Sequence, residues 1–274
     1  MRLLVADLMR HVDLCSGIGG FALGFELAGL SKPVLFCDIE PWSRKVLAKH
    51  WPDVPIAEDV KELASDAERL VPDCDILTAG YPCPPFSVAS KNNRLGAQDP
   101  RHIYPYISEI IAHKRPTFAV FENVFGHISL GIDEVLNDLA SQGYAARPFV
   151  FPSGAIHGAN HHRNRVFIIA KNVADTDSKG RKGWLPWRQN KERQGELGHA
   201  GCCSSTHRQP RQNASTVEPG ICRISDGLSI GVDEPPRVAT GIKQRTARLK
   251  GLGNAIVPAI AMRIGQTIKA VRDE

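Results

Sequence analysis

The sequence predicts an α/β fold: a Rossmann-like, mostly parallel sheet with an antiparallel edge strand and a small irregular insertion. From His11 to Ala170, short apolar runs alternate with amphipathic stretches of helical period, which is typical of βαβ units. A glycine-rich turn follows the first apolar run and opens the first helical stretch. After Lys171 the chain is rich in Gly, Ser, Arg, Gln and Asn with weak periodicity, which predicts irregular structure or disorder there.

Within the α/β region, the apolar runs and the amphipathic stretches set the expected elements. Strands are expected at His11–Leu14, Pro33–Cys37, Asp75–Ala79, Phe118–Phe121, Arg147–Phe151 and Arg165–Ala170. Helices are expected at Gly20–Ala28, Trp42–His50, Val60–Leu70, Ile103–His113 and Ile132–Gln142. No helical pattern separates the last two strands, so we expect them to form an antiparallel pair at one edge of the sheet.

The chain from Thr246 onward returns to a helical pattern. Ile256, Ile260, Ile264 and Ile268 recur every four residues and share one face of the expected helix. A terminal amphipathic helix usually packs against a core. We therefore expect three parts: an α/β domain at 1–170, a basic insertion at 171–236, and a C-terminal segment at 237–274 that returns to the α/β domain.

Composition and cysteine usage exclude several classes of protein. With 274 residues, 42% apolar and 23% charged, the chain resembles a soluble globular protein of one large domain or one and a half smaller ones. No apolar run approaches a membrane span, and charge interrupts residues 1–7 too early for a secretory signal. The seven scattered cysteines fit reduced thiols in a cytoplasm. We expect no metal site, because the adjacent Cys202 and Cys203 lack the spacing of zinc loops.

The net charge of +5 is uneven along the chain. Between Lys171 and Glu218, nine lysines and arginines stand against five acidic residues, and two tryptophans and two histidines accompany them. A basic segment with aromatic residues attracts a polyanion such as nucleic acid. A solvated linker has the same composition, so the charge alone leaves both interpretations open.

Polar residues follow three predicted strands at positions that suit a nucleoside-containing cofactor. Asp13–Phe21 follows the first strand, and its glycines let the backbone approach a ligand at the amino end of a helix. Asp38 ends the second strand, where an acid suits ribose hydroxyls. Asp59 lies near the end of the third strand region and suits an adenine amine. Each acid can instead cap a helix, as Asp59 can for Val60–Leu70.

Cys83 and Glu122 follow the next two strands. Pro82 and Pro84 hold Cys83 on a stiff, extended turn, where its thiol is a candidate nucleophile. Taken alone, the residue is better interpreted as a small buried hydrophobic side chain. Glu122 directly follows the expected strand Phe118–Phe121, where partial desolvation raises the pKa of a carboxyl group and suits it to act as an acid. Cofactor loop, nucleophile and acid then share the carboxyl edge of one sheet, where ligands bind.

This conjunction resembles the S-adenosylmethionine-dependent cytosine carbon-5 DNA methyltransferases of bacterial and phage type. The matching segments occur in the order of that family: Asp13–Phe21, Gly80–Ser87, Glu122–Val124, Arg163–Ile169 and Gly253–Pro258. They cover nearly all of residues 11–170 and 246–270. The resemblance therefore extends over most of the predicted α/β domain and the C-terminal helix.

The resemblance implies methyl transfer from S-adenosylmethionine to carbon 5 of a cytosine that has been flipped out of duplex DNA. Cys83 would add to carbon 6 of the base, and Glu122 would hold and protonate ring nitrogen 3. Arg165 would contact the carbonyl oxygen, and Asn123 would help to fix the site. The implied catalytic residues are Cys83, Glu122, Asn123, Arg163 and Arg165.

The resemblance also implies contacts to the cofactor and to DNA. The implied cofactor residues are Cys15, Ser16, Gly17, Gly19, Gly20, Phe21, Asp38, Ile39, Asp59, Val60, Gly80, Pro82, Asn254 and Ala255. The implied phosphate contacts are Ser87, Ser90, Lys91, Arg94 and Arg101. Glu40 lies two residues beyond Asp38, so which of these acids binds the ribose stays open. Tyr104 departs from the family pattern, which argues against a cofactor contact there.

Two other functions stay open. A tRNA-modifying branch shares the nucleophile turn and the acid, but its Cys-Phe-Thr element is not found here. A non-catalytic DNA-binding relative is disfavoured because every residue needed for the chemistry is present. We expect a cytoplasmic monomer that acts on double-stranded DNA through a small target-recognition region at Lys171–Pro236. The sequence leaves open the target site and the presence of a companion restriction endonuclease.

Overall fold

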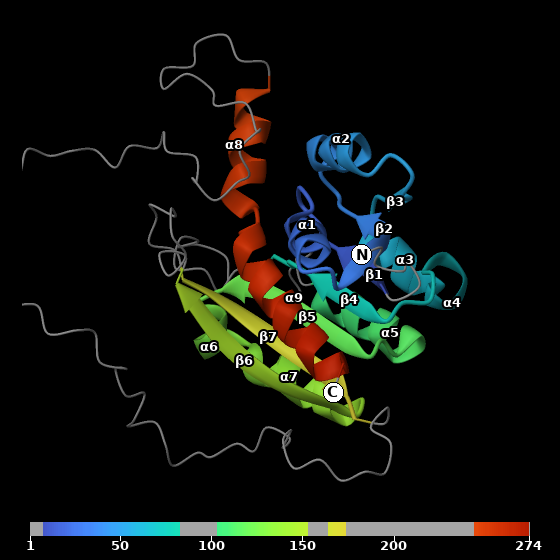
Figure 1. Ribbon diagram of the computed structural model, residues 1–274, viewed down its shortest axis with the longest axis vertical. Coiled ribbons are helices and arrows are strands. Elements are labelled where there is room, and N and C mark those ends of the chain that lie inside the picture. Colours follow the sequence, from blue (N-terminus) through green and yellow to red (C-terminus); the bar gives the residue numbers. More distant parts are fainter. Residues whose placement is uncertain (1–7, 83–102, 153–163, 174–243, 274) are drawn as a thin grey trace, which may run out of the picture.

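The structure, a computed structural model, describes residues 8–82, 103–152, 164–173 and 244–273. Its centre is a seven-stranded sheet with the strand order β3-β2-β1-β4-β5-β7-β6 (Figure 1). The strands are β1 (Met9–Leu14), β2 (Ser31–Cys37), β3 (Ile56–Ala57), β4 (Ile76–Ala79), β5 (Phe118–Val124), β6 (Tyr144–Pro152) and β7 (Asn164–Asn172).

Most of this sheet is parallel, and its antiparallel part lies at one edge. β1 pairs in parallel with β2 and β4, β2 with β3, and β4 with β5. β7 runs antiparallel to both β5 and β6. The predicted mostly parallel sheet with an antiparallel edge pair is confirmed; β6 is outermost and β7 lies between it and β5. All six predicted strands are present, with ends that differ by up to three residues.

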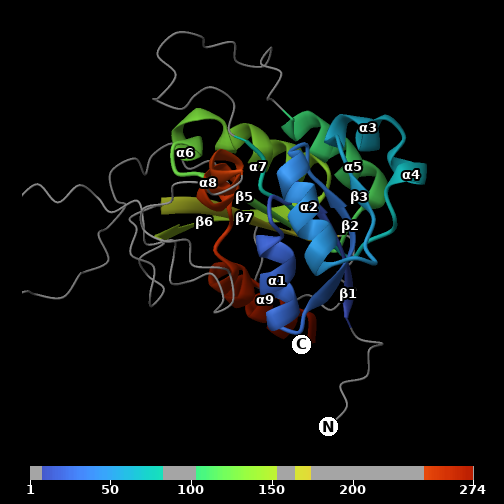
Figure 2. The same ribbon diagram turned by 90° about the horizontal axis from the view of Figure 1, so that it is seen from above.

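Helices cover both faces of the sheet and give the protein three layers. Figure 2 shows α1 and α9 on one face, and α5 and α7 on the other. The helices are α1 (Gly20–Leu27), α2 (Pro41–His50), α3 (Val60–Ser65), α4 (Ala67–Leu70), α5 (Tyr104–Lys114), α6 (His127–Leu130), α7 (Ile132–Ser141), α8 (Arg245–Asn254) and α9 (Pro258–Asp273). None of these described helices has the length and apolar character to cross a lipid bilayer.

One predicted helix is in fact two. The helix expected at Val60–Leu70 breaks at Asp66, whose φ of −150° is not helical. The carboxylate of Asp66 accepts a hydrogen bond from the backbone N–H of Arg69 at 3.4 Å and caps α4. Aspartate competes with helices for backbone donors in this way, so the prediction of one continuous helix was wrong.

The strand order reverses next to β1. From β1 the chain moves outward to β2 and β3, then returns to β4 on the other side of β1. In open α/β sheets, ligands bind beyond the carboxyl ends of the strands at such a switch point. Asp13 pairs with Thr78 and Leu14 with Ala79. The glycine-rich loop after β1 and the segment 80–82 after β4 therefore leave the sheet side by side.

The C-terminal helix α9 returns to the sheet, as its isoleucine repeat predicts. Three isoleucines of α9 are buried in the same apolar cluster as Phe21 and Phe25 of α1. The two helices approach closely because Gly24 has no side chain: a Cβ there would lie 2.5 Å from the Cβ of Ala261. This packing brings the junction between α8 and α9 to the glycine-rich loop (Figure 1).

Candidate active site

The loop after β1 has a tightly turned backbone. Cys15, Gly17 and Gly19 have positive φ angles of 50°, 55° and 84°, a region that glycine enters without steric cost. Ser16 fastens the loop, because its Oγ donates to the carbonyl oxygen of Asp13 at 2.5 Å. Gly19 is the N-cap of α1, and no side chain caps this helix. The first N–H groups of α1 are therefore free of side-chain caps and suit a polar ligand.

The junction between α8 and α9 packs directly on this loop. A Cβ at Gly20 would lie 2.6 Å from the carbonyl oxygen of Ile256 and 3.0 Å from its Cβ. Any side chain at Gly20 would therefore push the two segments apart. Asn254 is the exposed last residue of α8, and Ala255 joins it to Ile256. Both predicted C-terminal cofactor residues thus lie within two residues of the contact with the loop.

Asp38 holds the same loop from the end of β2. Its Oδ2 accepts from the backbone N–H of Gly17 at 2.7 Å, and its Oδ1 accepts from that of Glu40 at 2.9 Å. Burial raises the pKa of Asp38, and these two N–H donors oppose the rise. The neighbouring Ile39 is apolar yet 65% exposed. The carboxylate of Glu40 instead pairs with Lys250 of α8, so Asp38 is the acid of the two that contacts the loop.

Asp59 begins α3 beyond the short strand β3. Its Oδ1 accepts from the backbone N–H of Lys61 at 2.9 Å, so Asp59 is the helix N-cap that the sequence left open as an alternative. Val60 follows it and is buried in the core. Since Ala57 of β3 pairs with Cys37 of β2, Asp59 lies just beyond the carboxyl end of the strand beside β2.

Gly80 lies where the separate parts of the predicted site meet. A Cβ on Gly80 would lie 3.6 Å from the carbonyl oxygen of Cys15, 3.8 Å from Oε2 of Glu122, and 3.2 Å from Cδ1 of Ile256. The glycine-rich loop, β5 and the α8–α9 junction therefore converge on the segment that leads out of β4. Pro82, the last described residue of that segment, is exposed.

Glu122 and Arg165 form an ion pair across two antiparallel strands. Nε of Arg165 lies 2.7 Å from Oε1 of Glu122, and the two side chains are 17% and 11% exposed. Burial raises the pKa of Glu122 to about 7, although the guanidinium group opposes the rise. Burial also lowers the pKa of Arg165. Arg165 holds Oε1, so Oε2 is the oxygen that faces Gly80.

Asn123 follows Glu122 in β5, so its side chain lies on the opposite face of the sheet. Its Oδ1 accepts from the backbone N–H of Val124 at 2.8 Å. Its Nδ2 is buried and has no hydrogen-bond partner among the described residues. A buried amide donor without a partner costs about 1–3 kcal/mol. This group is therefore available to a ligand or to another part of the chain.

A buried polar chain beneath the loop was given no role by the sequence reasoning. Oγ1 of Thr78 donates to Oδ1 of Asp13 at 2.6 Å and lies 2.7 Å from Nε2 of His11. All three residues are fully buried. Oδ2 of Asp13 has no partner among the described residues, and burial raises the pKa of Asp13 to about 7. The sequence did contain a signal for these hydrogen bonds: the three polar residues interrupt apolar strands, and buried polar groups need partners.

Two aromatic residues near the site face the core. The side chain of Phe21 is 1% exposed and packs against Phe25 and Phe167, with ring centroids 5.7 Å and 6.1 Å apart. Phe21 thus supports the glycine-rich turn from the core side. Tyr104, for which the sequence argued against a cofactor contact, donates its hydroxyl proton to Asp138 at 2.8 Å, within the packing of α5 and α7.

Several predicted site residues lie outside the described residues. These are Cys83, Ser87, Ser90, Lys91, Arg94, Arg101 and Arg163. Most of the basic segment 171–236 lies outside them as well. Within the part of the chain that the structure describes, no group of three His, Cys, Asp or Glu residues is placed to hold a metal ion.

The arrangement of the sheet, the loop and the ion pair corresponds to a known family. The family model described as C-5 cytosine-specific DNA methylase matches residues 9–200. The chain belongs to this family. The match spans the sheet from β1 to β7 and includes the glycine-rich loop, the segment that leads to Cys83, and both members of the Glu122–Arg165 pair. The match confirms the family that the sequence motifs within residues 9–200 indicated.

Curated bacterial relatives agree with the assignment to the C-5 cytosine DNA methylases. The type II methyltransferase M.NgoMIV of Neisseria gonorrhoeae is 32% identical over 164 residues, which are 58% of this chain and 50% of that protein. The type II methyltransferase M.HgiBI of Herpetosiphon aurantiacus is 30% identical over 165 residues, which are 58% of this chain and 36% of that protein. The chain thus spans half or less of the length of these relatives.

Solved structures show the same fold. The Dnmt2 methyltransferase of S. pombe has a TM-score of 0.51 and 25% sequence identity to this chain. The superposition covers 60% of this chain and 50% of the S. pombe chain. A DNMT2 mutant of Spodoptera frugiperda also has a TM-score of 0.51, with 21% identity over 64% of this chain and 53% of its own. This member of the C-5 cytosine-specific DNA methylase family therefore has the Rossmann-like fold found in these methyltransferase structures.

Proposed function

We propose that this chain is a DNA (cytosine-5-)-methyltransferase that transfers a methyl group from S-adenosylmethionine to carbon 5 of a cytosine in duplex DNA through a covalent adduct with Cys83. The observation that carries this proposal is the position of Gly80. A Cβ on Gly80 would lie 3.6 Å from Cys15 of the glycine-rich loop and 3.8 Å from Glu122. Gly80 also stands three residues before Cys83 in the sequence. The cofactor loop and the acid thus meet at the segment that leads, in the sequence, to the nucleophile, and such a meeting suits a group transfer.

The residues present fit S-adenosylmethionine, which supplies an electrophilic methyl group when bound. Oδ2 of Asp13 is a buried acceptor without a partner among the described residues, and α1 has no side-chain cap. An acceptor and backbone donors suit the ammonium and carboxylate groups of a methionine. Asp38 would bind the ribose hydroxyls, the exposed Ile39 would pack on the adenine, and Asp59 would accept from the adenine amine.

Cys83 and Glu122 would together activate the base. Carbon 5 of cytosine is a weak nucleophile, and addition of the Cys83 thiolate to carbon 6 moves an electron pair toward carbon 5. With a pKa of about 7, Glu122 carries a proton in a large part of the molecules at neutral pH. Arg165 holds Oε1, which leaves the proton on Oε2. Glu122 would donate that proton to ring nitrogen 3 as charge develops there.

The adduct would then resolve by elimination. Once carbon 5 carries the methyl group, the proton on carbon 5 passes to a base. The double bond between carbons 5 and 6 then re-forms, and the sulfur of Cys83 leaves carbon 6. The proton on ring nitrogen 3 returns to Glu122. Arg165 would contact the carbonyl oxygen of the base, and Asn123 and Arg163 would help to fix the site. The cytosine must leave the duplex to reach these residues.

The proposed DNA contacts fall in segments outside the described residues. Phosphates would be bound by Ser87, Ser90, Lys91, Arg94 and Arg101. The basic region 171–236 would recognise the target sequence, since its lysines and arginines suit a polyanion. We further propose that the protein is a cytoplasmic monomer. The type II names of its bacterial relatives favour a companion restriction endonuclease.

Labelled methyl transfer tests the proposal. The protein is incubated with labelled S-adenosylmethionine and either duplex DNA or tRNA, with Cys83→Ser as the matched variant. The proposal predicts label in DNA that disappears in Cys83→Ser. Label in tRNA alone would instead indicate an RNA methyltransferase. No label in DNA, or label that survives Cys83→Ser, contradicts the proposal.

A further inference from the structure

A buried hydrogen bond joins the segment after β4 to the segment after β5. The hydroxyl of Tyr81 lies 3.1 Å from Nε2 of His127, and both residues are 3% exposed. Tyr81 directly follows Gly80, and His127 is the first residue of α6. The two rings are also in edge-to-face contact, with centroids 5.8 Å apart. The bond therefore links two loops that leave neighbouring strands at the same edge of the sheet.

The position of this bond in the chain gives it significance beyond stability. Tyr81 stands two residues before Cys83, and His127 stands five residues after Glu122. In the proposed function, Cys83 is the nucleophile and Glu122 is the acid. Their reacting groups must hold one relative position, and an error of about 1 Å can cost on the order of 10²-fold in rate. A buried bond between their two segments is a direct way to fix that position.

The surroundings of the pair favour a single, neutral arrangement. Burial lowers the pKa of His127 to about 4, so the imidazole is uncharged at neutral pH. The ring of Tyr81 also packs against Tyr104 and Phe121, with centroids 5.6 Å and 6.2 Å away. These contacts set where the ring lies, and the hydrogen bond sets where its far end points. The ring packing and the hydrogen bond together restrict where the side chain of Tyr81 can lie.

We propose that Tyr81 and His127 form a positioning pair for the methyl transfer: their hydrogen bond fixes the step from Gly80 to Pro82, and so the start of the segment that carries Cys83, relative to Glu122. The proposal rests on the function proposed above and adds two residues that act through others, without contact to the substrate. Loss of the bond should lower kcat more than it changes the KM for S-adenosylmethionine, because the bond joins the segments next to Cys83 and Glu122, whereas Asp38 at the end of β2 holds the glycine-rich loop.

Tyr104 supplies a matched control within the same aromatic cluster. It is 5% exposed, and its hydroxyl bonds to Asp138 of α7 rather than to a segment of the site. Tyr81→Phe and Tyr104→Phe thus each remove one buried tyrosine hydroxyl and leave the ring in place. Similar losses of stability are expected from the two variants, about 1 kcal/mol each. A difference in kcat between them then reports on positioning rather than on stability.

The kinetic experiment compares the full unmodified chain with five variants. Tyr81→Phe and His127→Phe should each lower kcat about tenfold, and the double variant should be no slower than either single one, because both remove the same bond. His127→Gln, whose amide can still meet the tyrosine hydroxyl, should restore most of the rate. Tyr104→Phe should stay within about twofold of the unmodified protein. Equal kcat in Tyr81→Phe and Tyr104→Phe, or additive losses in the double variant, would overturn the proposal.

A second readout separates this proposal from the proposed function. The rate at which iodoacetamide alkylates Cys83 is followed by mass spectrometry of the peptide that contains it. This rate should change at least threefold in Tyr81→Phe and stay unchanged in Tyr104→Phe. If the unmodified protein transfers no methyl group, the proposed function fails, while this readout still tests the pair. An alkylation rate that Tyr81→Phe leaves unchanged would count against the pair even in an active enzyme.

Discussion

Arg165 and Glu122 meet across β7 and β5, with Nε and Oε1 2.7 Å apart. The two residues are not directly opposite: Glu122 pairs with Phe167, and Arg165 pairs with Val124. Their contact is therefore a diagonal one between neighbouring strands. The guanidinium group fixes one oxygen of the carboxyl group, yet burial still raises the pKa of Glu122 to about 7. The pair orients the carboxyl group and leaves it able to carry a proton.

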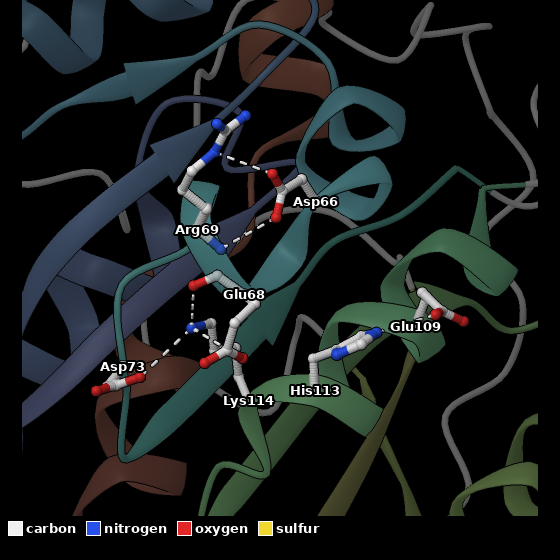
Figure 3. Close-up of polar contacts among 7 residues, drawn as sticks. All are labelled: Asp66, Glu68, Arg69, Asp73, Glu109, His113 and Lys114. Carbon is white, nitrogen blue, oxygen red and sulfur yellow. Dashed lines mark hydrogen bonds and ion pairs between the residues drawn. The ribbon is translucent and has the colours of Figure 1, made fainter.

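Glu122→Gln should lower the single-turnover rate of methyl transfer by about 10²-fold or more, because glutamine cannot act as an acid. The amide oxygen can still accept from Arg165, so the fold should be retained. The rate is measured with labelled S-adenosylmethionine and duplex DNA. Glu109→Gln is the matched control, since Glu109 is a surface residue paired with His113 (Figure 3). Equal rates in the two variants would exclude Glu122 as the acid.

The contribution of Glu122 to stability should depend on pH. Its pKa is about 7 in the folded protein and about 4.3 in an unfolded chain. Between these values the folded protein binds more protons than the unfolded chain, so this contribution is full below about pH 4 and is lost as the pH rises to about 7. The slope is at most about 1.4 kcal/mol per pH unit.

Urea denaturation of the unmodified protein and of Glu122→Gln over this range measures that contribution as a difference in the free energy of unfolding. The difference is needed because His11 and His127, whose pKa values burial lowers to about 3 and about 4, act in the opposite direction below about pH 6.5. The stability of the unmodified protein relative to Glu122→Gln should fall as the pH rises. A rising difference would show that the pKa of Glu122 is lowered instead.

Gly20→Ala should destabilise the protein by about 1–3 kcal/mol, because the added Cβ would lie 2.6 Å from the carbonyl oxygen of Ile256 and force the α8–α9 junction away. The same variant should bind S-adenosylmethionine more weakly. Gly126→Ala is the control, since a Cβ there meets nothing within 4 Å and its φ is −61°. Denaturation midpoints and calorimetric titration check both effects. Equal stability of the two variants would mean that the junction moves freely.

Lys114→Met should destabilise the protein by about 1–2 kcal/mol. The side chain of Lys114 is 4% exposed, and its Nζ donates to the carbonyl oxygen of Glu68 at 2.8 Å and lies 3.4 Å from Asp73 (Figure 3). Arg69→Met removes the exposed pair with Asp66 and should cost about 0.5 kcal/mol or less. Urea denaturation ranks the two, and a larger loss in Arg69→Met would contradict this.

The sheet could be predicted from the sequence because buried strands leave continuous apolar runs. The run around Ile76, for example, lies wholly in the core of the sheet. The break at Asp66 was missed because a single capping side chain outweighs helical spacing in a short segment. Local chemistry of this kind is visible in the sequence only when each aspartate is weighed as a possible cap.

The contacts within the candidate site depend on register and on loop paths, which apolar patterns do not specify. The acid Glu122 was predicted at the end of its strand, but its contact with Arg165 follows from the pairing of β5 with β7. Its distance from Gly80 follows from the pairing of β4 with β5. The bond between Tyr81 and His127 joins residues 46 positions apart. No periodicity relates such residues, so only the folded chain brings them together.

Trapping of the covalent adduct tests the central claim most directly. Duplex DNA made with 5-fluorocytosine carries fluorine where the proton must leave, so the sulfur of Cys83 cannot be eliminated after methyl transfer. With S-adenosylmethionine present, mass spectrometry should find a methylated cytosine adduct on the peptide that contains Cys83, and none in Cys83→Ser. Methylation of ordinary duplex DNA without any adduct on Cys83, or an adduct on another cysteine, would contradict the account.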